Sequence, residues 1–124
     1  MKVSVLLRQH DKLNGSESIL VNTTGLLNGE RLLYPEGKNA VHSVTFGEEE
    51  VILERKADVT SRTVLRKGGR GESFIDSEYG RLVLETELSR YEKNDTDFLV
   101  EYRVLSGNET VLDQLLIWEI RKIS

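Results

Sequence analysis

Apolar and polar residues alternate with a period of two along most of this chain, and turn residues interrupt the alternation roughly every 8–12 residues. Residues 98–105, for example, place Phe98, Val100 and Val104 on the face opposite Arg103. Successive side chains of a β-strand point to opposite faces, so this period is typical of strands that are buried on one side. The pattern therefore predicts an all-β fold.

Short glycine-containing turns separate the predicted strands. Asn14-Gly15 and Asn28-Gly29 are strong hairpin signals, and Gly107-Asn108 marks another turn. Pro35 is expected to end the third strand, and Gly25 is a candidate bulge in the second. The predicted strands cover residues 2–8, 18–26, 30–34, 41–46, 51–56, 62–67, 72–76, 81–91, 98–105 and 110–123.

The last of these segments, residues 110–123, has a competing interpretation as a short helix. Leu112 and Leu116 stand at helical spacing. Ile117-Trp118 favours a strand instead, and no glycine or proline follows to end a helix. We expect one long strand, bent or bulged near Asp113-Gln114.

Tight turns join neighbouring strands in antiparallel order, which favours a meander over Greek-key crossings. A meander of this length either leaves two unprotected edge strands or closes on itself, and closure removes the edges. The sequence therefore predicts one domain, residues 1–124: a single antiparallel up-and-down β-barrel of about eight to ten strands with little helix.

Several chemistries find no support in the residue types present. The chain has no cysteine, which excludes disulfides, thiol nucleophiles and thiolate metal sites. Its two histidines, His10 and His42, stand in no metal-ligand or Ser-His-Asp pattern, and His10 is expected in a solvated loop. Glu85 and Glu87 share a face with Arg103, as in ordinary cross-strand ion pairing. We expect no enzyme activity, no metal and no cofactor.

The charge distribution argues against a nucleic-acid partner. Lysine and arginine number 17 and aspartate and glutamate 21, so the net charge is −4. Residues 55–70 hold six basic residues and one acidic residue, yet few aromatic residues lie nearby to stack on bases. We interpret this basic segment as a solvated hairpin rather than a binding patch.

No apolar run approaches the ~20 residues of a membrane-spanning helix, and the apolar stretch that ends at Arg8 is too short for a secretory signal. These observations predict a cytoplasmic protein. They leave its oligomeric state open, a homo-oligomer included.

Three segments resemble motifs of the bacterial YwiB-like proteins. They are residues 64–68 (Val-Leu-Arg-Lys-Gly), residues 77–84 (Ser-Glu-Tyr-Gly-Arg-Leu-Val-Leu) and residues 101–104 (Glu-Tyr-Arg-Val), in the family's order and spacing. The chain departs from the family pattern at residues 34–46, where Pro-Glu-Gly replaces a longer stretch. The resemblance implies a lipocalin-like (calycin) barrel and implies no reaction.

Polar residues on the predicted inner face are the candidate ligand contacts. The expected apolar inner face comprises Val3, Val5, Leu7, Val51, Leu53, Leu82, Leu84, Leu88, Phe98, Val100, Tyr102, Val104, Leu116, Trp118 and Ile120. Arg55 continues the face of Leu53, and Arg66 continues that of Val64, so both enter the barrel if those faces point inward. A buried guanidinium needs an internal carboxylate or an anionic ligand; the alternative is that both extend to solvent from strand ends.

Two functions follow from this arrangement. The first is non-enzymatic binding of a small amphipathic or anionic molecule in the barrel, with candidate contacts Arg55, Arg66, Tyr102, Trp118 and His42. The second is a protein-interaction or structural barrel whose core is filled by side chains and holds no ligand. Barrels of this size exist in both forms, and the volume of the cavity distinguishes them.

Overall fold

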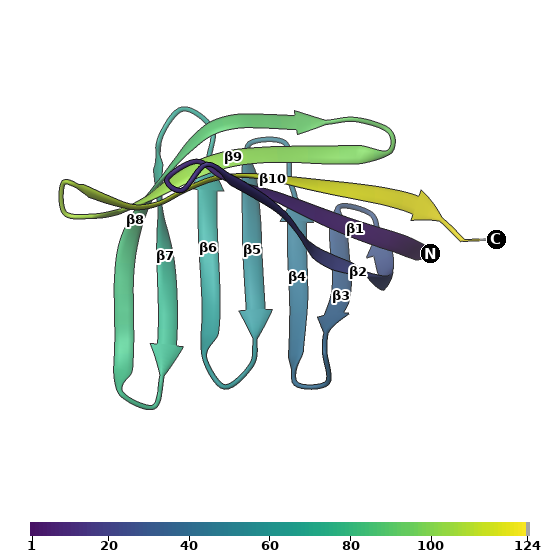
Figure 1. Cartoon of the computed structure of the whole chain (residues 1–124), viewed down its shortest axis with the longest axis horizontal. Coiled ribbons are helices and arrows are strands. Elements are labelled where there is room, and N and C mark those ends of the chain that lie inside the picture. Colours follow the sequence, from purple (N-terminus) through teal and green to yellow (C-terminus); the bar gives the residue numbers. More distant parts are fainter. Residues whose placement is uncertain (124) are drawn as a thin grey trace.

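The computed structural model describes residues 1–123, which form ten β-strands joined by short turns (Figure 1). The strands are β1 (Lys2–Asp11), β2 (Ser16–Asn28), β3 (Arg31–Glu36), β4 (Ala40–Phe46), β5 (Glu50–Lys56), β6 (Thr60–Arg66), β7 (Arg70–Ser77), β8 (Gly80–Lys93), β9 (Asp97–Ser106) and β10 (Glu109–Lys122). Residues 1–123 contain no helix, and therefore no helix able to cross a membrane.

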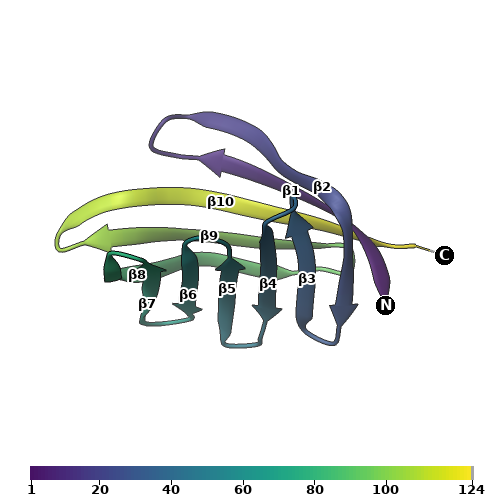
Figure 2. The same cartoon turned by 90° about the horizontal axis from the view of Figure 1, so that it is seen from below.

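Each strand pairs antiparallel with the strands before and after it in the sequence, and β1 pairs with β10 to close the barrel. The predicted up-and-down barrel is therefore confirmed. The barrel is flattened: the short strands β3 to β7 run across the long strands β1, β9 and β10, with β8 bending from one layer to the other (Figures 1 and 2). The core lies between these two layers.

Two glycines stand where neighbouring strands diverge or bend. A Cβ atom on Gly71 would lie 2.0 Å from the carbonyl oxygen of Val64, and Thr86 Oγ1 donates a hydrogen bond of 2.7 Å to that same oxygen. A Cβ atom on Gly25 would lie 2.5 Å from the carbonyl oxygen of Leu33. Only glycine fits so close to another backbone.

The structure corrects three local predictions. Gly25 is not a bulge, because the register of β2 against β1 shifts between Leu7 and Arg8 instead. β10 is a strand as expected, but its irregularity lies between Thr110 and Leu112 rather than at Asp113-Gln114. β3 continues through Pro35, since its pairing with β2 ends at Leu33, and a strand without a neighbour on one side tolerates proline.

Most of the predicted inner face is buried. Leu82 is the exception, with 53% of its surface exposed, because β8 pairs with β9 only from Glu85 onward and its first residues extend beyond the core. The prediction for Leu82 was wrong. The core also contains apolar residues that the prediction left out: Val21, Leu32, Tyr34, Val44, Phe46 and Leu65.

Candidate functional site

A cavity of about 200 Å³ lies inside the barrel between the two layers. Two lining residues are partly exposed to solvent, Leu20 on β2 and Arg55 on β5. Leu20 lies in the part of β2 that pairs with β1 but not with β3. Four of the five predicted site residues line this one cavity although they come from four strands: His42, Arg55, Tyr102 and Trp118. The remaining wall is formed by Leu7, Leu20, Tyr34, Val44, Leu53, Glu54, Ser61, Thr63, Gln114 and Leu116.

Cross-strand pairing arranges the short-strand layer in rows of increasing polarity. The deepest row is apolar and places Phe46 opposite Val51, which is opposite Leu65. The next row is mixed, with Val44, Leu53 and Thr63 side by side on β4, β5 and β6.

The outermost row is polar and runs across β3 to β6 through Tyr34, His42, Arg55 and Ser61. The mixed row and the polar row line the cavity, whereas the row of Phe46, Val51 and Leu65 does not. Aliphatic side chains such as Val44 and Leu53 therefore share one space with polar ones, which is the surface that an amphipathic molecule matches.

The opposite wall combines buried aromatic and amide groups. Trp118 Nε1 donates to Tyr34 Oη at 3.1 Å, and the Trp118 ring packs edge-on against Phe46. Gln114 Nε2 donates to Tyr102 Oη at 2.7 Å. Burial raises the pKa of Tyr34 and of Tyr102 to about 12, so both hydroxyls stay protonated at neutral pH.

A carboxylate, a guanidinium and an imidazole meet at the rim. Arg55 Nε donates to Glu36 Oε1 at 3.1 Å, and His42 Nε2 lies 2.5 Å from the same oxygen. The imidazole of His42 also stacks on Tyr34, with ring centroids 4.8 Å apart. The hydrogen bonds from Arg55 and then from His42 lower the pKa of Glu36 to about 2.

Glu36 is a rim residue that the sequence analysis missed. The predicted strand ended before Pro35, so Glu36 was assigned to a loop. The signal was its spacing of two from Tyr34, which puts both side chains on the same face once the strand continues.

Arg66 does not line the cavity. It lies on the outer face of β6, 3.3 Å from Glu72 and 3.8 Å from Glu50. Its neighbour Leu65 pairs with Val51 and belongs to the hydrophobic core. Arg66 shares the other face of β6 with Val64, which is also buried but does not belong to that core. Arg66 is therefore not a cavity contact; of the two alternatives, the structure shows the one in which its side chain extends to solvent, with 46% of it exposed.

Two further arginines of the basic segment pair with acidic residues on adjacent strands. Arg62 lies 4.0 Å from Glu54, and Arg70 pairs with Glu85 and Glu87 on β8. Such pairs are the cross-strand contacts of a solvated sheet.

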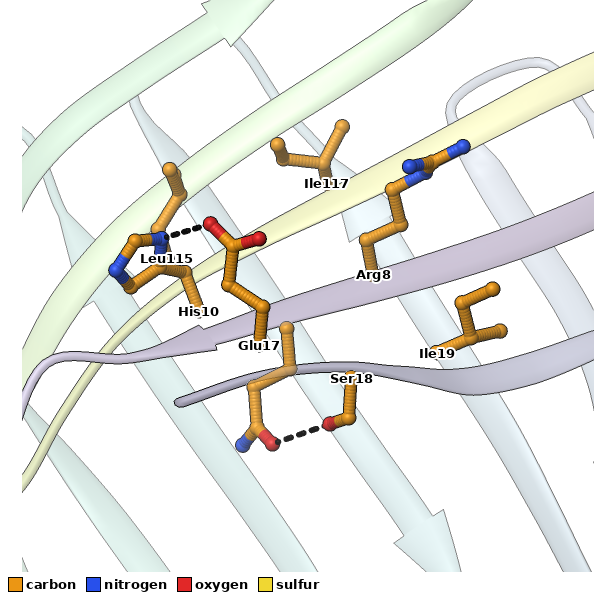
Figure 3. Close-up of a pocket in the computed structure, with 8 residues that line it drawn as sticks. Arg8, His10, Glu17, Ser18, Ile19, Leu115 and Ile117 are labelled. Atoms are coloured by element: carbon orange, nitrogen blue, oxygen red, sulfur yellow. Dashed lines mark hydrogen bonds and ion pairs between the residues drawn. The ribbon is translucent and has the colours of Figure 1, made fainter. Parts of the chain in front are cut away.

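A second hollow, of about 490 Å³, lies beside β1, β2 and β10 (Figure 3). His10 Nδ1 lies 2.9 Å from a carboxylate oxygen of Glu17 in this hollow, and none of the predicted site residues lines it. His10 lies in β1, opposite Glu17 of β2, and the expectation that it lies in a loop was wrong. Within residues 1–123 no three histidine, aspartate or glutamate side chains gather as metal ligands.

Comparison with known proteins places the chain in a family. No curated protein matches its sequence. The crystal structure of the YwiB protein from Bacillus subtilis superimposes with a TM-score of 0.75 and 14% identity, covering 99% of this chain and 92% of that one. Residues 3–116 match the family described as Domain of unknown function (DUF1934). The chain therefore belongs to the DUF1934 family, and the YwiB-like resemblance of its sequence is confirmed.

Proposed function

We propose that the barrel binds a small amphipathic molecule in the 200 Å³ cavity and performs no chemistry on it. The observation that carries this proposal is the convergence of His42, Arg55, Tyr102 and Trp118 on one space that aliphatic side chains also line. Pockets for drug-sized ligands span roughly 300–1,000 Å³. The ligand is therefore smaller than a typical drug.

The rim favours an uncharged or weakly polar ligand over an anionic one. Arg55 is the cation nearest the cavity, and the carboxylate of Glu36 already bonds to it. The two side chains are 39% and 45% exposed, so this pair lies at the solvent-facing rim, and the guanidinium already has a carboxylate partner before any ligand binds. Arg55 and His42 act in this proposal as a polar boundary to the cavity.

The test uses the fluorescence of Trp118, the single tryptophan and a lining residue. Titration with 1-hexanol is expected to change the emission saturably in the wild type. Leu53→Phe fills the cavity and is expected to abolish the response, whereas Ile52→Phe, on the other face of the same strand, retains it. No saturable response in the wild type, or equal responses in both variants, would contradict the proposal.

The second candidate is a protein-interaction barrel without a ligand, and one surface feature favours it. Residues 80–84 of β8 have β7 as their neighbour on one side only, and Leu82 and Val83 are about half exposed there. Exposed strand edges with apolar side chains pair readily with other chains. Self-association through this edge stays a prediction; sedimentation equilibrium of the wild type and of Val83→Lys tests it. A cytoplasmic location likewise stays a prediction.

A further inference from the structure

The rim of the cavity brings one carboxylate together with two nitrogen bases. Arg55 already bonds to both oxygens of Glu36, with Nε donating to Oε1 at 3.1 Å and Nη2 donating to Oε2 at 3.4 Å. His42 Nε2 lies 2.5 Å from the same Oε1. One negative charge therefore faces a permanent cation and an imidazole, a group that changes its charge between about pH 5 and pH 8.

Among residues 1–123, the other groups at this end of the cavity add no net negative charge. The lining residues that come from β1, β2, β9 and β10 are uncharged at neutral pH: Leu7, Leu20, Tyr102, Gln114, Leu116 and Trp118. Glu54 also lines the cavity, and its carboxylate lies 4.0 Å from Arg62. Lys38 and Asp58 line an adjoining hollow and carry one charge of each sign. A proton on His42 therefore leaves this end of the cavity with an excess positive charge.

His10, the other histidine of the chain, has a different setting. It faces a carboxylate of its own, because its Nδ1 lies 2.9 Å from Glu17. Its side chain is 44% exposed, against 18% for that of His42, so solvent screens its charge more strongly. His42 stacks on Tyr34 and lines the cavity, whereas His10 lines the second hollow. Of the two histidines, His42 is the one whose proton lies beside the space for a ligand.

We propose that a proton on His42 turns the rim into a site for an anionic head group, so that the cavity takes an amphipathic anion in mildly acidic solution. This inference rests on the proposed function of the cavity and adds a ligand class and its pH dependence. The head group lies between His42 and Arg55, and the alkyl chain lies against Val44 and Leu53 in the adjacent row. Hydrogen bonds from Arg55 and then from His42 lower the pKa of Glu36 to about 2, so this carboxylate stays ionised while the imidazole titrates.

The test uses two probes with the same alkyl chain, 1-hexanol and hexane-1-sulfonate, whose sulfonate stays ionised throughout. Dissociation constants are measured from the fluorescence of Trp118 at about pH 8 and at about pH 5.5, on either side of the imidazole transition. In the wild type, hexane-1-sulfonate is expected to bind roughly 2- to 5-fold more tightly at the lower pH, the effect of one partly exposed ion pair. The affinity for 1-hexanol is expected to be the same at both.

Three variants assign the effect to its residues. His42→Gln keeps an amide N–H for Glu36 but takes up no proton, so it is expected to lose the rise in sulfonate affinity while it still binds 1-hexanol. His10→Gln is the matched control and is expected to keep the rise. Glu36→Gln releases Arg55 from its carboxylate, so it is expected to bind hexane-1-sulfonate more tightly than the wild type at the higher pH. This third variant keeps the inference testable if His42→Gln does not fold.

Two results would overturn the inference and leave the proposed function intact. The first is a sulfonate affinity in the wild type that is equal at the two pH values while 1-hexanol binds. The second is a rise that survives in His42→Gln and disappears in His10→Gln, which would place the anion in the second hollow. Failure of 1-hexanol to bind at either pH would reject the proposed function, and this inference with it.

Discussion

Trp118 and Tyr34 join the two layers of the barrel through one hydrogen bond, in which the indole of β10 donates to the hydroxyl of β3 at 3.1 Å. Trp118 is also the largest fully buried side chain and packs edge-on against Phe46. One residue thus lines the cavity and connects strands from the two layers. Its removal affects both packing and hydrogen bonding.

Trp118→Ala is expected to lower the free energy of unfolding by about 3–5 kcal/mol, because it leaves a large cavity in a packed core. Urea unfolding followed by circular dichroism measures this change. Tyr79→Ala, at a position 92% exposed, is the control and should change stability by less than about 0.5 kcal/mol. Red-shifted, readily quenched emission from the folded wild type would show instead that Trp118 is exposed.

Gly71→Ala is expected to destabilise the barrel by about 1–3 kcal/mol, because the added Cβ would lie 2.0 Å from a backbone oxygen, that of Val64. Gly69→Ala, two residues earlier, adds a methyl group with no neighbour within 4 Å and is the matched control. Thermal unfolding of the two variants gives the comparison. Equal melting temperatures would mean that the corner at Gly71 relaxes without cost.

The ion pairs of Glu36 predict a dependence of stability on acid. The pKa of Glu36 is about 2 in the folded protein, against an ordinary value of 4.5, first because of Arg55 and then because of His42. A carboxyl with a lowered folded pKa stabilises fully above its unfolded pKa, and this contribution is lost as the pH falls toward the folded pKa. The melting temperatures of the wild type and Glu36→Gln should therefore converge between about pH 4.5 and pH 2. A constant difference across that interval would contradict the prediction.

Arg66→Met is expected to change stability by less than about 0.5 kcal/mol, since its ion pairs with Glu50 and Glu72 lie on the exposed outer face. Binding of 1-hexanol should be unchanged for the same reason. Arg55→Met, at the rim, is expected to alter that binding. Fluorescence titration with 1-hexanol compares the affinities of the two variants. A loss of binding in Arg66→Met would show that Arg66 contributes to the binding site.

The strands and their order could be predicted from the sequence, because both depend on local features. Alternation with a period of two identifies residues that suit a half-buried strand, and turns such as Asn28-Gly29 join successive strands antiparallel. On β9 and β10 the inner face was also correct, since Val100, Tyr102 and Trp118 each have a charged residue directly after them in the sequence. The same alternation placed Trp118 and Tyr102 inside the barrel.

The composition of the site was decided by the tertiary structure. On β6, Val64 and Leu65 are consecutive apolar residues, so alternation cannot tell which of the two faces inward; the pairing of Leu65 with Val51 on β5 decides it and sends Arg66 outward. Glu36 meets Arg55 across 19 residues of sequence, because β3 continues past Pro35 where it lacks a neighbour on one side. Side-chain direction within a strand follows from local geometry, but which strand lies opposite, and in which register, depends on contacts between distant residues.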